Sequence, residues 1–562
     1  MPAQRLPDQW YYLKNFEFVL HWVARRCDDL LLDEERHFIR QFPALPRASR
    51  ALAARMIMRK GPLFRASRLR YPEIGDITLA MAPLLAQQWV CHQPVIDLPT
   101  LFRLLTRHEL SAIFRRSLTQ LGLQSASKAV QCDALLALWP GTRTLAQWLA
   151  CSDTNQLGLD ETLYEVQVVP LCERLRLMFF GNLRQDWSEF VLADLGLYSY
   201  ETVDFHASAR AFQSRHDIDA YLHLHRCRER LDSAEDADTC AAAISDVPIA
   251  PYDSEWLENR RARLLYHAGG RFERMHQWQQ ALHCYTLSTD RGARARRVRM
   301  LERLQQAEQA LTLARAILDT PASEAEQQAV LRMLPRLQRH CGHTPDRRKN
   351  GMPTQRDDLS LPAPAQPMRI EEEVRLHLHT TQAPAFYVEN TLFNTLFGLL
   401  CWDAVFASVP GAFFHPYQQG PADLLRSGFR QRRGALFNTC LAQLDTDSYR
   451  NTIMQRFESK HGLQSPFVYW GAVPRELLEL ALHCIPAAHL GAIFHRLLDD
   501  IRDNRAGLPD LIQFWPAQQR YRLIEVKGPG DRLQDNQIRW LGYCVQHGID
   551  TRVCHVNRAV SS

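Results

Sequence analysis

The sequence predicts a multidomain protein that is mainly α-helical in its N-terminal and middle regions and ends in a small α/β domain. Three observations support this fold class. Apolar residues recur at helical spacing through most of residues 1–342, a proline-rich segment follows, and residues 369–562 combine short β-rich runs with an apolar helix. At 562 residues the chain is long enough to form several domains, each with its own core.

The N-terminal region, residues 1–98, is predicted to be helical and to bind DNA. Apolar and charged residues alternate at helical spacing from Phe16 to Phe42, as in helices that pack one face on a core. The sequence around Gly61-Pro62 gathers five cations, Arg59, Lys60, Arg65, Arg68 and Arg70. Such a cluster is either an ordinary solvated surface or a set of contacts to a phosphate backbone, and the sequence leaves both open.

Residues 99–145 read as a compact helical unit. Two helical stretches flank the turn at Leu121-Gly122-Leu123, an arrangement that resembles a SAP module, a small DNA-binding helix pair. The second helix has few basic residues, so DNA contact and simple helix packing both remain open. Residues 146–250 continue the helical pattern without a motif that indicates chemistry.

A weak repeat occupies residues 251–342. Trp278–Tyr285 and Gln306–Ala314 suit stacked helix pairs of the tetratricopeptide (TPR) kind. Such arrays often present a binding groove, so these helices are a candidate surface for a protein partner. Residues 343–368 are rich in proline, charge and turn formers, which predicts a linker without helix or sheet.

Residues 369–562 contain the elements of the α/β domain. Leu511–Trp515 and Tyr521–Val526 are rich in aromatic and β-branched residues, which predicts two strands joined by a hairpin loop. A helix is expected at Asp531–His547 and a further strand at Asp550–Val556. Together these elements form a small mixed α/β core.

Three charged side chains meet at one end of the predicted hairpin. A pairing that places Trp515 near Tyr521 sets Asp510 opposite the segment from Glu525 to Lys527. Glu525 and Lys527 share one face, because side chains alternate along a strand. Carboxylates bind Mg²⁺ or Mn²⁺, and such an ion activates water and stabilises charge in phosphodiester hydrolysis. A solvated strand end is the alternative interpretation.

Glu389 is a third candidate ligand. It stands at the head of an apolar helix candidate, Asn390–Asp403, in line with a stripe of Phe393, Leu396, Phe397 and Leu400. A carboxylate on that stripe faces the interior, where an unpaired charge is costly. A metal ion would resolve the cost, while an arginine partner or helix capping are the alternatives.

Two arginines, Arg502 and Arg505, stand just before Asp510. Arginine binds phosphate bidentately, which predicts that this pair grips the phosphates of the cleaved strand.

These motifs together resemble the Fanconi-anaemia-associated nuclease family, within the VRR-NUC branch of the PD-(D/E)xK nucleases. The matching stretches are Glu389 with its helix, Gly507–Asp510, Glu525–Arg532, Gln537–Trp540, Phe397–Asp403, Tyr417–Leu424, Tyr11–Phe16, Arg59-Lys60 and Leu69–Ile74. The likeness covers most of the chain. The sequence departs from animal relatives in lacking their Cys/His-rich ubiquitin-binding finger, which puts recruitment through ubiquitinated partners in doubt. The resemblance is to a bacterial member of the family.

The resemblance implies roles for individual residues and a reaction. The implied metal ligands are Glu389, Asp510, Glu525 and Val526, the implied catalytic residues are Lys527 and Gln537, and Arg532 is an implied DNA contact. The implied enzyme is a metal-dependent phosphodiesterase of the phosphodiesterase I type, with Mg²⁺ or Mn²⁺ as cofactor. It would cleave 5′ flaps and degrade DNA from 5′ ends in DNA repair, especially of interstrand crosslinks. Its substrates would be branched DNA, namely flaps, forks and nicked or gapped duplexes.

Composition and charge indicate what kind of nucleic-acid surface the protein can have and which cellular compartment it occupies. A net charge of +5 is small for this length, so a nucleic-acid surface must be local. Fourteen cysteines occur without a Cys-x-x-Cys pair, which favours reduced thiols in a cytoplasm. The start lacks a signal-peptide pattern, and the apolar run Leu392–Val409 predicts a buried helix rather than a membrane span. We expect a cytoplasmic, nucleoid-associated protein, or a nuclear one in a eukaryote.

Two other functions share some of these features. A Holliday-junction-type resolvase of the same superfamily would normally be a short symmetric dimer, unlike this long helical chain. A non-catalytic DNA-binding scaffold would need none of the four intact residues Glu389, Asp510, Glu525 and Lys527.

Overall fold

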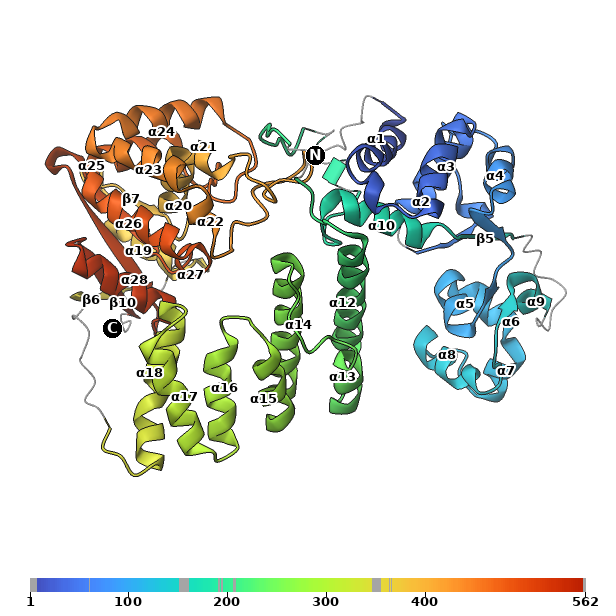
Figure 1. Cartoon of the computed structure of the whole chain (residues 1–562), viewed down its shortest axis with the longest axis horizontal. Coiled ribbons are helices and arrows are strands. Elements are labelled where there is room, and N and C mark those ends of the chain that lie inside the picture. The colour runs from blue at the N-terminus through green and yellow to red at the C-terminus, as the bar shows by residue number, and fades with distance from the viewer. Residues whose placement is uncertain are drawn as a thin grey trace. The chain divides into compact units, whose positions relative to one another are not determined.

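The computed structural model divides the chain into two compact units (Figure 1). The first unit comprises residues 1–197 and 210–212, and the second comprises 198–209 and 213–562. The structure describes residues 8–558 except 60, 151–160, 188, 191–192, 194–195, 206–208, 346–354, 363 and 365.

The first unit begins with helices around a small antiparallel sheet. Its strands run in the order β1 (Leu63–Arg65), β5 (Leu163–Val166), β2 (Val90–His92). The helices are α1 (Tyr11–Arg26), α2 (Asp33–Gln41), α3 (Arg47–Ile57), α4 (Ile77–Ala86) and α10 (Val169–Phe180). Helix α1 forms because Phe16, Val19 and Val23 recur on one face, and all three are buried. The sheet corrects the purely helical expectation for residues 1–98, since its central strand comes from residues 163–166.

The SAP-like segment folds as a separate helical cluster within the first unit. It contains α5 (Leu98–Leu104), α6 (Arg107–Ile113), α7 (Arg115–Gln120), α8 (Lys128–Leu136) and α9 (Leu145–Ala150). Strands β3 (Val95–Ile96) and β4 (Arg143–Thr144) pair antiparallel and join the two ends of the cluster. Thr106 and Glu109 form a capping box at the start of α6, and Trp148 is fully buried in the shared core.

In the second unit, antiparallel helices stack side by side in Figure 1, from green to yellow. They are α12 (Arg215–Ser233), α13 (Ala237–Ile244), α14 (Glu255–Arg274), α15 (Trp278–Leu287), α16 (Ala293–Arg303), α17 (Ala307–Asp319) and α18 (Glu324–His340). Gly269 permits the close packing of α14 on α15, because a Cβ there would lie 2.7 Å from the ring of Tyr285. The array starts at α12, earlier than the predicted boundary at 251, since α12 and α13 share a core with α14.

The C-terminal domain is built on a five-stranded mixed sheet. The strand order is β6 (Gln355–Leu361), β10 (Thr551–Arg558), β9 (Arg520–Lys527), β8 (Leu511–Trp515), β7 (Ala385–Tyr387). Strand β10 runs parallel to β6 and β9, and β8 runs antiparallel to β7 and β9. The helices are α19 (Ile370–Leu378), α20 (Leu392–Leu400), α21 (Trp402–Val405), α22 (Phe429–Arg432), α23 (Gly434–Ala442), α24 (Ser448–Ser459), α25 (Arg475–Cys484), α26 (Ala487–Asp499), α27 (Ile501–Asn504) and α28 (Asp535–Gln546).

Strand β6 corrects the linker prediction for residues 343–368. Its polar sequence carries no strand signal, yet it pairs over its full length with β10. Asp357 of β6 accepts a hydrogen bond from Arg552 of β10 at 2.9 Å, which adds charge complementarity to the pairing. The C-terminal domain therefore includes residues from the predicted linker.

Helices cover both faces of this sheet. On one face Ile512 and Phe514 join the large core that contains α20, α25 and α26. On the other face Leu511 and Val526 pack with Val374 of α19. The helix predicted within Leu392–Val409 is confirmed as buried by α20. Among the described residues no single helix is long and apolar enough to cross a membrane, and only the bent pair α25 and α26 together reaches that length and composition.

Candidate nuclease active site

The β8–β9 hairpin brings the two predicted carboxylates together. Leu511 pairs with Ile524, so the neighbouring residues Asp510 and Glu525 stand across from each other, as predicted. Trp515 pairs with Arg520, one residue from its expected neighbour. Asp510 Oδ2 also accepts a hydrogen bond from the Val526 N–H at 2.8 Å, which ties the carboxylate to β9.

Asn390 fixes the loop that carries Asp510. Its side-chain Oδ1 accepts hydrogen bonds from the N–H groups of Gly507 at 2.8 Å and Leu508 at 3.2 Å. Asn390 has a left-handed φ of 52°, and asparagine tolerates this conformation better than most residues. Gly507 is required at its position, because its φ is 98° and a Cβ would lie 2.8 Å from Asn536. No pattern in the sequence singles out Asn390 in advance, since its partners lie far along the chain.

Glu389 lies beside this loop, in the turn between β7 and α20. It is not on the helical stripe, which corrects the expectation that it faces the interior from the helix itself. The hydroxyl of Tyr387 donates to Glu389 Oε2, and Asn390 Nδ2 donates to Oε1 at 3.2 Å. The neighbouring Val388 N–H donates to the Asp510 carbonyl at 2.8 Å, so the Glu389 turn and the Asp510 loop are directly linked.

Burial and neighbouring negative charge raise the pKa of Asp510 and of Glu525. Burial is the largest cause for both groups, and it raises the pKa of Asp510 to about 6 and that of Glu525 to about 7. The negative charge of Asp510 raises the pKa of Glu525 further, and Glu389 raises the pKa of both. Lys527 opposes these effects by favouring the ionised forms.

Glu371 is a nearby acidic residue that the sequence motifs do not include. It lies in the first turn of α19, and its charge adds to the rise in the pKa of Asp510. The available signal is the acidic run Glu371-Glu372-Glu373, of which Glu372 and Glu373 instead pair with arginines. Sequence alone does not show which acid of the run approaches the site.

The residues at this site fit a divalent cation. Both carboxylate oxygens of Glu525 are buried without a well-directed hydrogen bond, although Lys527 Nζ lies 2.8 Å from Oε1. Buried anionic oxygens are costly unless a cation compensates them, and hard carboxylate oxygens suit Mg²⁺ or Mn²⁺. Among the described residues no group of three or more Asp, Glu, His or Cys side chains is already placed to hold a metal ion. Asp510, Glu525 and Glu389 are the residues that would hold the ion.

Val526, Gln537 and Arg532 surround the site in different ways. The Val526 side chain is buried on the α19 face, and its N–H is bound to Asp510. Gln537 Oε1 accepts from the Gln534 N–H at 2.8 Å as part of the cap of α28. Arg532 is exposed. The ligand role of Val526, the catalytic role of Gln537 and the DNA contact of Arg532 stay predictions.

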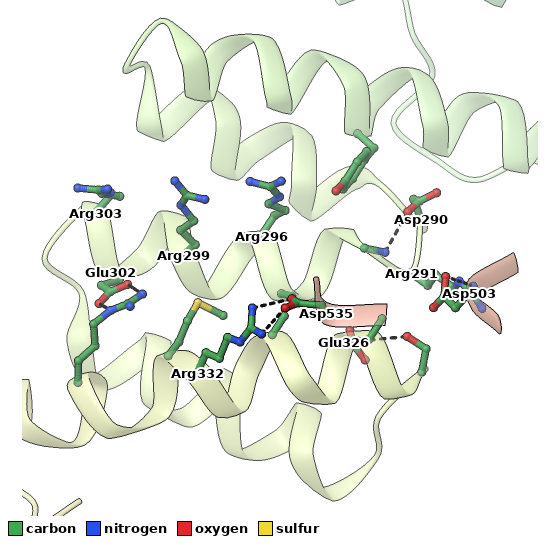
Figure 2. A pocket seen from close by; sticks show the side chains of 18 of the residues that line it. Asp290, Arg291, Arg296, Arg299, Glu302, Arg303, Glu326, Arg332, Asp503 and Asp535 are labelled. Atoms are coloured by element: carbon green, nitrogen blue, oxygen red, sulfur yellow. Dashed lines mark hydrogen bonds and ion pairs between the residues drawn. The ribbon is translucent and has the colours of Figure 1, made fainter. Parts of the chain in front are cut away.

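Arg502 lines a cavity of about 1040 Å³. The cavity lies between α16 and α18 of the repeat array and α27 and α28 of the C-terminal domain (Figure 2). The cavity is rich in arginine, with Arg296, Arg299 and Arg303 projecting from α16. Arg502 is not a free cation, because Nη2 lies 3.5 Å from Asp290 Oδ2. Arg505 is half-buried. DNA contact by either Arg502 or Arg505 stays a prediction.

The N-terminal basic cluster is smaller than the sequence indicated. Arg65 is a buried side chain that donates to Glu109 and to Glu161, the latter at 2.7 Å, so it is no exposed phosphate contact. This corrects its assignment as a DNA-binding residue, because two carboxylates neutralise the guanidinium. Arg59, Arg68 and Arg70 are exposed, and Lys60 lies outside the described residues.

Comparison with known proteins identifies the family. Three family models match: "FAN1, HTH domain" at residues 10–91, "Fanconi anemia-associated nuclease SAP domain" at 95–148 and "VRR-NUC domain" at 445–558. The last range contains Asp510 and Glu525 but not Glu389, which the fold brings to them. The SAP and VRR-NUC resemblances are thereby confirmed.

The similarity extends over the whole chain. The Fanconi-associated nuclease 1 homolog of Pseudomonas aeruginosa is 51% identical over 551 residues, covering 98% of this chain and 96% of that protein. The homolog of Arabidopsis thaliana is 24% identical, covering 98% of this chain and 68% of that protein. The crystal structure of paFAN1 bound to 2-nucleotide 5′-flap DNA with a gap matches with a TM-score of 0.95 and 50% identity, covering 100% of both chains. The chain therefore belongs to the Fanconi-associated nuclease 1 family, as a bacterial member.

Proposed function

We propose that this nuclease cleaves 5′ flaps, degrades DNA from 5′ ends and serves the repair of interstrand crosslinks. The reaction would be phosphodiester hydrolysis of the phosphodiesterase I type, with Mg²⁺ or Mn²⁺. The convergence of Asp510, Glu525 and Glu389 beside Lys527 carries the proposal, together with the buried oxygens of Glu525, which have no well-directed hydrogen bond. The related paFAN1 is crystallised on 5′-flap DNA with a gap, which supports branched DNA as the substrate here.

Each residue at the site has a distinct task in this proposal. A bound divalent ion would supply an activated water and stabilise charge on the phosphate. The hairpin register fixes the positions of Asp510 and Glu525, and the Val526 N–H orients the Asp510 carboxylate for binding the ion. Lys527, only 10% exposed, holds its ammonium group at Glu525, where it offsets negative charge as the phosphate enters.

The arginine-rich cavity supports a role in holding the substrate. Arg296 and Arg299 share one acidic partner, Glu273, so the positive charge there exceeds the negative. Arg303 lies over the ring of Trp278 at 5.6 Å and lines the same cavity. The arginine side chains of this cavity are already held in place by protein contacts, so they could bind the phosphates of a branched DNA strand.

A cleavage panel tests this function. Wild-type protein with Mg²⁺ or Mn²⁺ is expected to cut a labelled 5′ flap faster than a 3′ flap, a four-way junction or plain duplex, and to do so without a protein partner. Equal rates on all substrates would contradict structure specificity, and faster cleavage of the four-way junction would favour the Holliday-junction alternative. A crosslinked flap substrate, tested beside its uncrosslinked twin, separates the repair role from flap cleavage alone.

Charge reversal in the N-terminal cluster tests DNA binding by the first unit. The double variant Arg68→Glu/Arg70→Glu is expected to weaken binding of flap DNA and to flatten the plot of log affinity against log salt. The slope should change by about one unit for each phosphate that the variant no longer neutralises. Fluorescence anisotropy at several salt concentrations, in Ca²⁺ to prevent cutting, measures both effects. An unchanged slope would identify the cluster as an ordinary solvated surface.

Localisation follows from the same proposal. We propose a nucleoid-associated protein of the bacterial cytoplasm. The described cysteines are all free, and most are buried, which is compatible with a reducing compartment. A fluorescent fusion that stays away from the nucleoid after crosslinking damage would contradict this placement.

A further inference from the structure

Tyr387 stands at the active site, but the proposed reaction gives it no role. It is the last residue of β7 and pairs with Leu511, the residue that follows Asp510. Among the described residues β7 is the outermost strand of the sheet, so no described strand covers the flank beside Tyr387. The tyrosine therefore lies at the rim of the carboxylate cluster.

The exposure of Tyr387 contrasts with the burial around it. Tyr387 is 39% exposed, whereas Asp510 is 6% and Glu525 0% exposed. The preceding residue, Phe386, packs into the large core against Phe514, with ring centroids 6.1 Å apart. Among the described residues Tyr387 belongs to none of the apolar clusters, so core packing does not account for its aromatic ring.

The hydroxyl of Tyr387 has a defined task. It donates to Glu389 Oε2, while Asn390 Nδ2 donates to Oε1 at 3.2 Å. Glu389 lies in the turn between β7 and α20, and among the described residues these two side chains are the hydrogen-bond partners of its carboxylate. The orientation of its carboxylate thus depends on these two neighbours, one of which is a tyrosine with a partly exposed ring.

We infer that Tyr387 joins the substrate to the metal site: its hydroxyl orients Glu389 toward the divalent ion, and its exposed ring supports the nucleoside next to the scissile phosphate. An aromatic face stacks on any base, so this contact suits a nuclease that selects DNA by shape. A nucleoside seated on the ring would press the phenol into the position in which it holds Glu389. Tyr387 is a positioning residue toward Glu389 and a contact residue toward DNA. The inference rests on the proposed function.

Three substitutions separate the hydroxyl from the ring. Tyr387→Phe removes only the hydroxyl, and Tyr387→Leu removes both. Tyr387→Trp keeps an aromatic face without the phenol, so it guards against a packing defect in the leucine variant. Tyr469 provides the matched control, because it is a similarly exposed tyrosine of the same unit at 36%, and Tyr469→Phe and Tyr469→Leu are expected to behave as wild type.

The hydroxyl is tested on DNA-free protein by calorimetric titration with Mn²⁺. Tyr387→Phe is expected to bind Mn²⁺ at least about fivefold more weakly than wild type, since a mobile Glu389 must be ordered at binding. An unchanged Mn²⁺ affinity would overturn the positioning role. This measurement needs no cleavage, so it distinguishes failure of the inference from failure of the proposed function.

The ring is tested with 2-aminopurine placed next to the scissile phosphate of a flap, in Ca²⁺. Wild type, Tyr387→Phe and Tyr387→Trp are expected to quench the fluorescence by stacking. Tyr387→Leu is expected not to quench the fluorescence, and its affinity for the flap DNA is expected to fall about tenfold. Quenching by Tyr387→Leu equal to that of wild type would overturn the contact role.

Discussion

Glu525→Gln is expected to abolish cleavage of 5′-flap DNA and, at the same time, to make the metal-free protein more stable above pH 7. The loss of cleavage should be at least about a thousandfold, since an ordered anionic ligand is replaced by a neutral amide. Flap binding in Ca²⁺-free buffer with EDTA should change little. Single-turnover cleavage and anisotropy measure the two quantities on the same substrate.

The gain in stability follows from the sign of the pKa shift. Burial raises the pKa of Glu525 from 4.5 to about 7 in the folded protein, so the native state binds a proton more tightly than the unfolded chain. The stability of the wild type therefore falls as pH rises from about 4.5 through 7. Glutamine has no charge to bury, and the variant should gain on the order of 2 kcal/mol at pH 8 in EDTA.

The pH dependence provides the control. At pH 5 the wild-type Glu525 is protonated and neutral in the folded state, so the two proteins should melt at nearly the same temperature. Glu479→Gln is a matched variant, because Glu479 is 55% exposed and, within the part of the chain that the structure describes, pairs only with surface Arg475. It is expected to leave both cleavage and the pH profile unchanged. A Glu525→Gln protein that melts below wild type at pH 8 would refute the account of the buried charge.

The hairpin and its carboxylates can be predicted from sequence because local rules govern them. Side-chain alternation and a short loop set the register, so Asp510 and Glu525 can be placed opposite each other without any knowledge of the rest of the fold. The apolar helix after Glu389 follows from its periodicity in the same way. These features depend on residues close in the chain.

The features that escape prediction depend on distant partners. Arg65 reads as a surface cation because its partners, Glu109 and Glu161, lie 44 and 96 residues away. Strand β6 has the sequence of a polar linker and becomes a strand only through pairing with β10, which lies in a distant part of the chain. No local sequence pattern predicts the ion pairs of Arg65 or the strand β6, because contacts with distant residues override the local propensities of both segments.

Asn390→Gly is expected to slow flap cleavage about a hundredfold while leaving the backbone path intact. Asn390 bonds to Gly507 and Leu508, 117 and 118 residues away, and these bonds hold the loop that carries Asp510. Glycine adopts the φ of 52° without strain, so the substitution removes the amide contacts alone. Without them the Asp510 loop and the Glu389 turn can shift apart, and misplacing reacting groups by about 1 Å costs roughly that factor.

Gln519→Gly is the matched control for this variant. Gln519 also has a left-handed φ, 46°, but it lies in the turn at the far end of the β8–β9 hairpin from Asp510. Its replacement by glycine is expected to leave the rate unchanged, because it removes no hydrogen bond to the carboxylate loops. The loss in Asn390→Gly should appear in kcat more than in the affinity for flap DNA, and higher Mn²⁺ should recover part of it, since the ion can draw the displaced carboxylates together. A wild-type rate in Asn390→Gly would show that β7 and β8 alone hold Glu389 and Asp510 in register.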